Sequence, residues 1–242
     1  MDTTIPKHDH LADPTGATLP FGSAAYRSFF RNHLAGKLNG NLYVLANLSL
    51  LVAVIAALAL SIPKYEPYFL VLLPGYFMFV NGIEYVLHRY PMHHKTPGFM
   101  VVYEHVTTHH NFYANQDFYF EEPRDYYAAV LPYYIFIGLT VVIGSVSGVI
   151  YLGFGLGNAL FFALVAYSYY LTYELLHFTY HMPANSLMKK LPFINGLSRA
   201  HILHHQTKLM AHYNFNITFP IYDWLLGTSY KGPMPDSLPQ AK

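Results

Sequence analysis

The sequence predicts an all-α integral membrane protein with about four transmembrane helices and a cytosolic helical cap that carries a histidine-cage di-metal site. Three observations support this prediction. Hydrophobic residues make up 53% of the 242 residues and charged residues only 11%, against about a quarter in ordinary soluble domains. Long segments without charge have the length of membrane spans. The chain also contains 15 histidines, most of which lie in four short clusters.

The composition excludes several classes of protein. A chain this apolar is not disordered. Lysines and arginines number 14 and acidic residues 13, so bulk electrostatics give no reason to expect a nucleic-acid partner. The absence of cysteine excludes disulfides, thiolate-ligated haem, iron–sulfur clusters and a cysteine nucleophile.

A single membrane domain is predicted over residues 23–231, between a flexible polar tail at residues 1–22 and a C-terminal tail at residues 232–242. The first tail lacks the apolar run of a signal peptide. From Tyr26 to Leu34, apolar side chains recur at helical spacing among basic residues, which predicts a short helix. This helix either lies in the lipid headgroup region or packs on the protein as a soluble amphipathic helix.

The first two spans are predicted at residues 42–62 and 67–88. The first of these segments is 21 residues without a charge, which is the length of one membrane span. Pro63 and Pro67 follow it closely, and two prolines in a short polar segment favour a tight hairpin.

The third and fourth spans come from one run without charge, residues 126–173, which is 48 residues long. As a single helix it would measure about 72 Å, more than twice the hydrocarbon thickness, so the chain must fold back. Three glycines within residues 153–158 predict the turn. The spans are therefore predicted at residues 127–152 and 158–181.

The basic residues predict the orientation of these spans. On the side of the membrane that holds both termini there are 13 lysines and arginines, whereas the other side holds only Lys64. Positive charge is retained on the cytoplasmic side. We therefore expect a multi-pass protein of a bacterial inner membrane or the endoplasmic reticulum, with both termini and the active site in the cytoplasm.

Four histidine clusters fall on that same side of the membrane. Two histidines four residues apart on a helix share a face, with Cβ atoms roughly 5–6 Å apart, which suits two imidazoles on one metal ion. His177 and His181 have this spacing, and His105 and His109 repeat it. The candidate metal ligands are His88, His93, His105, His109, His110, His177, His181, His201, His204 and His205.

Adjacent histidines predict that there are two ions. His109 and His110 point about 100° apart on an ideal helix, as do His204 and His205. One member of each pair can therefore face one ion while its neighbour faces a second.

The ten imidazoles allow about five for each ion. A structural zinc site closes at four ligands and normally contains cysteine, whereas imidazole suits iron, copper, nickel and zinc alike. His88 and His93 lie about 140° apart on a straight helix. They can converge only if the helix breaks, and Pro91 lies between them.

The other histidines carry weaker signals. His94 follows a predicted ligand and could substitute for it. His212 could be an outer ligand or a group on the substrate side. His8, His10 and His33 are expected to have no role in the site.

Carboxylates near the spans are candidate partners of the imidazoles. Glu84 lies four residues before the first cluster and Glu174 three before the third. A carboxylate at the end of an apolar span is costly unless it is paired. We therefore expect both to hydrogen-bond imidazoles and fix their tautomers, with ordinary interfacial solvation as the alternative. Glu104 has weaker support for the same role. A polar run is expected to be a solvated loop: Asp117, Glu121, Glu122, Arg124 and Asp125.

At these residues the sequence resembles the fatty acid hydroxylase superfamily, the membrane di-metal oxygenases. The superfamily includes fatty acid 2-hydroxylases, sterol oxidases and desaturases, and carotene hydroxylases. The resemblance covers about residues 82–230. It includes the opening Glu84-Tyr-Val-Leu-His88-Arg-Tyr-Pro-Met-His93, the four clusters in order, and a tail at residues 214–228.

The resemblance implies a cytosolic histidine cage that holds two irons, with zinc as an alternative in isolated protein. It also implies O2 as co-substrate and a separate electron-donor protein, since the His-Pro-Gly-Gly of a fused cytochrome b5 module is absent. The second cluster reads HxxxHH here, whereas several members have HxxHH. This difference leaves open which of His105, His109 and His110 binds which ion.

The predicted function is that of a membrane-bound di-iron oxygenase, a monooxygenase of lipid metabolism. It would use O2 and external electrons to hydroxylate a C–H bond of a lipid, with a fatty acyl chain as first candidate. Acid–base groups alone cannot cleave such a bond, so a redox cofactor is needed. The alternatives are a desaturase or sterol or carotenoid oxidase of the same superfamily, a histidine-rich transition-metal carrier and a bis-histidine haem cytochrome. A carrier would need polar ligands within the bilayer, and the span centres have no acid or base.

Overall fold

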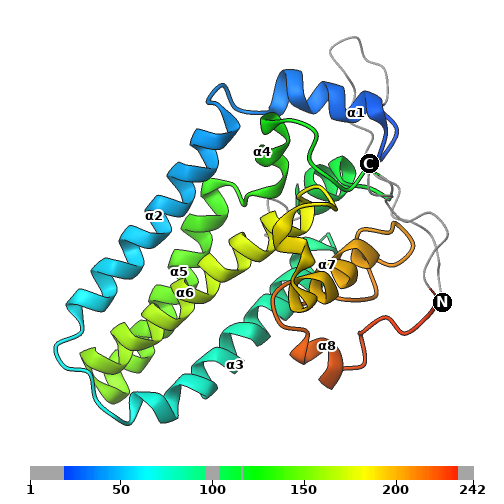
Figure 1. Ribbon diagram of the computed structural model, residues 1–242. Helices are drawn as coiled ribbons and strands as arrows, with labels where there is room; N and C mark the ends of the chain where they lie inside the picture. Colours follow the sequence, from blue (N-terminus) through cyan, green and yellow to red (C-terminus); the bar gives the residue numbers. More distant parts are fainter. Residues whose placement is uncertain (1–18, 96–103, 116, 234–242) are drawn as a thin grey trace.

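A computed structural model describes residues 19–95, 104–115 and 117–233 of the chain, which form helices, turns and loops without a strand (Figure 1). The elements in chain order are α1 (Ala24–Phe29), η1 (Phe30–Leu34), α2 (Gly40–Ser61), α3 (Phe69–Leu87), η2 (His88–Met92), η3 (His105–His110), η4 (Pro123–Asp125), α4 (Tyr126–Ala129), α5 (Tyr133–Phe154), α6 (Leu156–His181), η5 (Leu187–Lys190), α7 (Pro192–His204) and α8 (Ile221–Leu225).

Four long helices, α2, α3, α5 and α6, are apolar and long enough to cross a membrane. Figure 1 shows them running together as one bundle. Helix α6 contacts each of the other three and contributes the largest share of buried residues. The predicted all-helical membrane fold with four spans is therefore confirmed.

The third span differs from its prediction at its start. Residues 126–129 form the separate short helix α4, and α5 begins at Tyr133, directly after Pro132. A proline disfavours helical backbone in the residue before it, so the chain is extended where the sequence alone predicted a continuous helix. This break matters for the site, because the α4 backbone and the linker after it line the histidine cage.

The turn between α5 and α6 lies where the glycines predicted it. Gly155 has a φ of 81° and joins the last residue of α5 to the first of α6. Glycine adopts this left-handed conformation without the steric cost that a Cβ adds. One residue therefore reverses the chain at the end of the bundle away from the cap.

The cap is the group of shorter elements at the other end of the bundle: α1, η1–η5, α4, α7 and α8 with their connecting segments (Figure 1). Its first helix packs on the protein, which is one of the two alternatives that the sequence left open. Tyr26 and Phe30 are buried against Phe112 and Tyr113. The Ser23 side chain accepts a hydrogen bond from the Tyr26 N–H and so caps α1.

The polar run at residues 117–125 is not simply a solvated loop, as the sequence suggested. Asp125 is fully buried and accepts two hydrogen bonds from Arg31, at 2.7 and 2.9 Å. It also accepts hydrogen bonds from the backbone N–H groups of Glu121 and Glu122. This carboxylate therefore ties the N-terminal helices to the segment that follows the second histidine cluster.

Candidate metal centre

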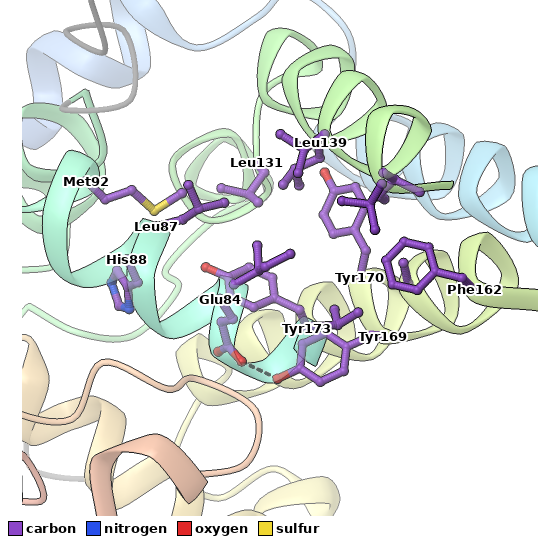
Figure 2. Close-up of a pocket in the computed structure, with 16 residues that line it drawn as sticks. Glu84, Leu87, His88, Met92, Leu131, Leu139, Phe162, Tyr169, Tyr170 and Tyr173 are labelled. Carbon is purple, nitrogen blue, oxygen red and sulfur yellow. Dashed lines mark hydrogen bonds between the residues drawn. The ribbon is translucent and has the colours of Figure 1, made fainter. Parts of the chain in front are cut away.

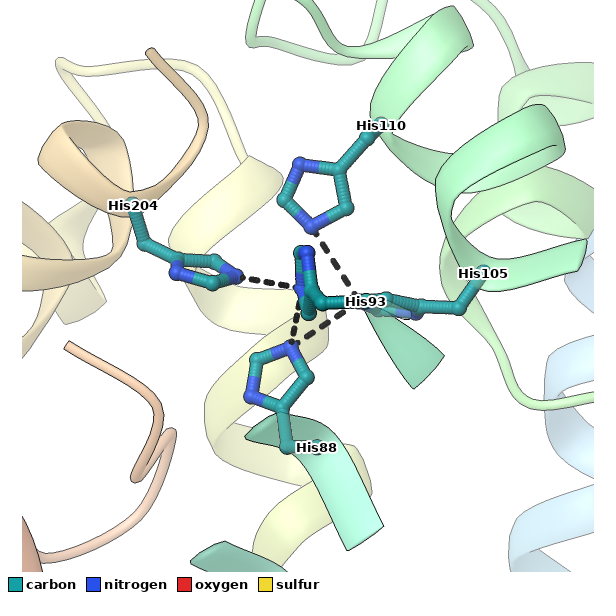
Figure 3. A group of neighbouring side chains, drawn as sticks. All are labelled: His88, His93, His105, His110 and His204. Atoms are coloured by element: carbon teal, nitrogen blue, oxygen red, sulfur yellow. Dashed lines mark hydrogen bonds between the residues drawn. The ribbon is translucent and has the colours of Figure 1, made fainter. Parts of the chain in front are cut away.

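Ten histidines from four parts of the chain converge inside the cap, and all are buried. In each of two groups of five, the candidate ligand atoms lie within 4.8 Å of one another. Figure 3 shows the rings of the first group pointing toward a common centre. The first group is His88, His93, His105, His110 and His204; the second group is His109, His177, His181, His201 and His205.

The imidazoles meet through their Nε2 atoms at regular distances. In the first group the Nε2 separation is 3.0 Å for His88 and His105, and 3.2 Å for His105 and His110. In the second group, His109 and His177 are 3.1 Å apart. Two imidazoles bound to one ion at 2.0–2.1 Å would be about 3.0 Å apart at a right angle and about 3.4 Å apart in a tetrahedron. The separations therefore fit an ion with more than four ligands.

The first group is built from two pairs of histidines spaced five residues apart. His88 and His93 span η2, and His105 and His110 span η3; both segments are π-helical, with Pro91 inside the first. A π-helix bonds residue i to i+5, so it aligns side chains that an α-helix would hold about 140° apart. The helix therefore widens between His88 and His93, where a break was expected from the sequence.

The second group is built from two pairs spaced four residues apart. His177 and His181 end α6, and His201 and His205 lie at the end of α7. Both segments are α-helical, so ordinary i, i+4 alignment brings each pair together. Helix geometry thus assigns each pair to its group.

The adjacent histidines divide between the two groups, as their angular separation predicts. His109 belongs to the second group and His110 to the first, while His204 belongs to the first and His205 to the second. His105 and His109, which were expected to share a face, lie in different groups because η3 is π-helical. The extra residue of HxxxHH relative to HxxHH is accommodated by this wider turn.

Backbone carbonyl oxygens orient five of the rings through Nδ1. If Nδ1–H donates to a carbonyl, the lone pair of Nε2 faces the centre of the cage. We assign this tautomer from the hydrogen-bond network. The pairs are His88 with Phe215 (2.5 Å), His109 with Ala128 (2.6 Å), His181 with Phe118 (2.9 Å), His204 with Tyr213 (2.8 Å) and His205 with Tyr113 (3.0 Å).

Burial lowers the pKa of the cage histidines that lie outside the spanning helices. The pKa of His109 is lowered to about 3, because desolvation penalises the charged imidazolium. The pKa values of His105 and His110 are also well below the usual value, first from burial and then from neighbouring histidines. The same holds for His204 and His205. Neutral imidazole is the form that binds a metal ion.

Glu84 contacts a different partner from the one expected. Its carboxylate accepts hydrogen bonds from the N–H groups of Ile217 (2.5 Å) and Thr218 (3.1 Å) and from the Thr218 hydroxyl (2.7 Å). No hydrogen bond joins it to a histidine of the described residues. It holds the segment whose Phe215 carbonyl orients His88, so it acts on the cage through the backbone.

The other acidic candidates also lie beside the cage without contacting its rings. Glu174 is buried on α6 near Tyr170 and the backbone of Leu131. Glu104 is exposed and accepts a hydrogen bond of 2.5 Å from the Tyr134 hydroxyl. Among the described residues, neither carboxylate hydrogen-bonds an imidazole.

The remaining histidines lie outside both groups. His94 is exposed, and its ring bonds the Arg89 carbonyl. His212 is exposed, and His33 packs on Phe29. His8 and His10 lie outside the described residues.

Two cavities border the cage. The first lies between α3, α5 and α6 and has apolar walls, with His88 and Met92 at the cap end and Phe162 at the far end (Figure 2). The second is lined by histidines of both groups, including His105 and His177, and by the linker before α5. Met92 lines both cavities, so the two spaces adjoin at the edge of the cage.

Comparisons with known proteins agree with this geometry. The family model described as fatty acid hydroxylase matches residues 73–228, more than half of the chain. Among solved structures, the chain is similar to full-length Scs7p, in which only the hydroxylase domain is visible. The TM-score is 0.54 with 21% sequence identity, covering 79% of this chain and 67% of that chain. At this identity the likeness shows a shared fold. A search of curated proteins finds no match.

Proposed function

Because the chain belongs to the fatty acid hydroxylase family, we propose that it is a membrane-bound, O2-dependent di-iron monooxygenase that hydroxylates a C–H bond of a lipid acyl chain. One observation carries the proposal: two groups of five imidazoles lie together, and the first of them borders, through His88, an apolar cavity between membrane-spanning helices. An aliphatic chain can enter such a cavity from the bilayer, and its C–H bonds would then lie beside the cage.

The ten clustered histidines would hold the metal ions, five imidazoles to each ion. Bound irons would supply the redox chemistry that cleaves a C–H bond with O2, which amino-acid side chains cannot do. Zinc would fit the same nitrogen donors but has no redox chemistry. The choice of iron therefore rests on the reaction, because imidazole alone does not select the metal.

The residues of the cavity would bind and orient the substrate. Leu139, Val142 and Ile143 of α5 face α3 and α6 across the cavity, and contact with an acyl chain would remove apolar surface from water. Met92 at the cap end would set how far the chain advances toward His88. The same apolar wall would keep water from the reacting carbon.

A separate protein would supply the electrons. Hydroxylation places one oxygen atom of O2 in the C–H bond and releases the other as water, which consumes two electrons and two protons. The histidine cage contains no further redox group among the described residues. We place the cap and both termini on the cytoplasmic side, because 13 of the 14 lysines and arginines lie on that side of the four spans.

Product analysis tests the function. The purified chain, loaded with iron and given a reductant, a candidate acyl lipid and labelled O2, should yield a product that gains one labelled oxygen atom. A loss of two hydrogens without oxygen would identify a desaturase. Conversion of sterols or carotenoids but not acyl lipids would change the substrate class.

A matched pair of variants distinguishes the loss of a cage histidine from the general effect of substituting a histidine. His177→Ala removes a ring of the second group and should abolish turnover. His212→Ala changes an exposed histidine outside both groups and should retain it. Full activity of the first variant would contradict the proposed role of the cage.

A further inference from the structure

The cap has an apolar surface beside the membrane-spanning bundle. We call Trp224, Leu225 and Leu226 the α8 surface. Trp224 is 67% exposed and Leu225 68% exposed. Phe193, at the start of α7, is also exposed, and its ring lies 6.0 Å from that of Phe219, just before α8. Adjoining exposed apolar side chains of this size mark an interaction site.

The segment that carries the α8 surface packs on the side of α3. Phe219 lies 5.3 Å from Phe77, ring to ring, and Tyr222 lies 6.0 Å from Tyr85. Gly82 permits this approach, because a Cβ there would lie 2.8 Å from the Tyr222 ring. Figure 1 shows α8 beside the cap half of α3.

The contacts on α3 lie within its membrane-spanning part. At 1.5 Å per residue, Tyr85 and Phe77 lie about 5 and 16 Å along the helix from His88. One leaflet of the hydrocarbon core is about 15 Å thick. The segment from Phe219 to Leu226 therefore packs on α3 at the depth of a leaflet.

The buried residues 215–218, which precede this segment, have the backbone hydrogen bonds that a nonpolar surrounding requires. Asp223 is fully buried and accepts hydrogen bonds from the N–H groups of Phe215 (3.0 Å) and Asn216 (2.7 Å). Glu84 accepts those of Ile217 and Thr218. Two carboxylates thus satisfy four consecutive N–H groups of a non-helical stretch.

The N–H groups around α8 are also bonded within the protein. Tyr222 donates to the side chain of Asn216, Trp224 to the Pro220 carbonyl, and Leu226 to the Tyr222 carbonyl. Water would satisfy such groups in an ordinary exposed loop. Hydrocarbon cannot, so irregular backbone at membrane depth needs internal partners.

We propose that the α8 surface is inserted among the lipid acyl chains of the leaflet on the cap side. Contacts with Phe77, Gly82 and Tyr85 hold this segment at the depth of the leaflet. The N–H groups of Tyr222, Trp224 and Leu226 have partners within the protein, and tryptophan is typical of the membrane–water interface. The cap is therefore anchored in the bilayer by an element that does not span it. The proposal does not depend on the reaction that the cage performs.

The insertion connects lipid packing with the metal centre. The segment from Phe219 to Leu226 begins four residues after Phe215, whose carbonyl holds the Nδ1 atom of His88 at 2.5 Å. Its neighbours Ile217 and Thr218 are bonded to Glu84, one helical turn before His88. A leaflet that displaced α8 would therefore displace an orienting partner of the first group.

The single tryptophan of the chain makes the proposal directly testable. The full chain, reconstituted in phosphatidylcholine vesicles, is examined with lipids brominated at shallow or deep acyl positions and with iodide in the water. Shallow bromines should reduce Trp224 fluorescence roughly twofold and more than deep ones, because an interfacial segment inserts about 5–10 Å. Iodide should have little effect.

Two other outcomes overturn the proposal. Quenching by iodide without quenching by brominated lipid would place Trp224 in water. Protection from both quenchers would mean that protein, such as a second copy of the chain, covers the α8 surface.

Reference variants calibrate the measurement. Trp224→Phe combined with Leu70→Trp moves the fluorophore to an exposed position of the spanning helix α3 and should respond to brominated lipid. Trp224→Phe combined with Lys208→Trp moves it to an exposed cap position and should respond to iodide. If Trp224 behaves like the Lys208→Trp reference, the proposal fails.

Discussion

At the scale of the residue, five of the ten imidazoles are oriented by backbone carbonyl groups, most of which lie far away in the sequence. His205 is held by the carbonyl of Tyr113 and His88 by that of Phe215. The type of a residue does not reveal whether its backbone carbonyl will orient an imidazole. The sequence therefore indicated carboxylates as the candidate partners. Glu84 lies near the cage, but it fixes the backbone that supplies a carbonyl. The ten rings themselves were identifiable because their spacing is local.

The adjacent histidines of α7 make a prediction about single ions. His204 belongs to the first group and His205 to the second. Replacing either with alanine should lower the metal content from two ions to about one, because each variant removes one of the five imidazoles of one group. It should also reduce turnover at least about 100-fold. Metal analysis of the purified variants, with His94→Ala as the control outside both groups, checks this. Two retained ions and full activity in either variant would contradict the assignment.

At the scale of the element, the cage depends on where helices change their form. Residues 127–132 were predicted to belong to a span, yet α4 ends at Ala129 and supplies, through Ala128, a carbonyl to His109. The break follows from Pro132, which could be identified, but its position beside the cage depends on tertiary packing. The spans themselves were predictable, since their length and lack of charge are properties of contiguous sequence.

Asp125 joins the N-terminal helices to the cage segment, and its loss should be costly. Arg31 bonds this fully buried carboxylate at 2.7 Å, and buried Arg27 lies 3.7 Å from it. Asp125→Ala would leave the two arginines with half-exposed carboxylate partners and the N–H groups of Glu121 and Glu122 without their acceptor, so we expect about 3 kcal/mol less free energy of unfolding. Asp117→Ala removes a partner of Arg27 that is 45% exposed and should cost less than about 1 kcal/mol.

Thermal or denaturant unfolding in detergent compares the two variants. Equal losses would show that burial of Asp125 does not set the strength of this contact. Sequence reasoning placed both aspartates in a solvated loop, because a local charge run does not reveal which carboxylate is covered.

At the scale of the whole molecule, the histidines buried in the cap make the stability depend on pH. An unfolded histidine has a pKa near 6.5, whereas burial lowers that of His109 to about 3. At this ring the unfolded chain therefore binds more protons than the folded chain at any pH between these values. The contribution of such rings to stability is present above pH 6.5 and decreases as pH falls below it.

This linkage predicts acid sensitivity of the metal-free protein. Each buried ring whose pKa is strongly lowered should cost about 1.4 kcal/mol for every pH unit below 6.5, because folding must exclude its proton. Bound metal should shift this loss of stability to lower pH, since protons must first displace the ion. Unfolding midpoints measured from about pH 7.5 to pH 5, with and without metal, check both statements. A flat profile for the metal-free protein would contradict them.

The wider turns at η2 and η3 have a consequence for reading related sequences. Each of these π-helical turns contains one residue more than a turn of α-helix, and the histidines on either side of it still belong to the same group. Deleting that residue and restoring a regular α-helix would leave the two rings four residues apart, which is the spacing that shares one face of an α-helix. The spacing of the histidines and the type of helical turn therefore compensate for each other. Two chains whose histidine motifs differ in length by one residue can build the same arrangement of ten imidazoles.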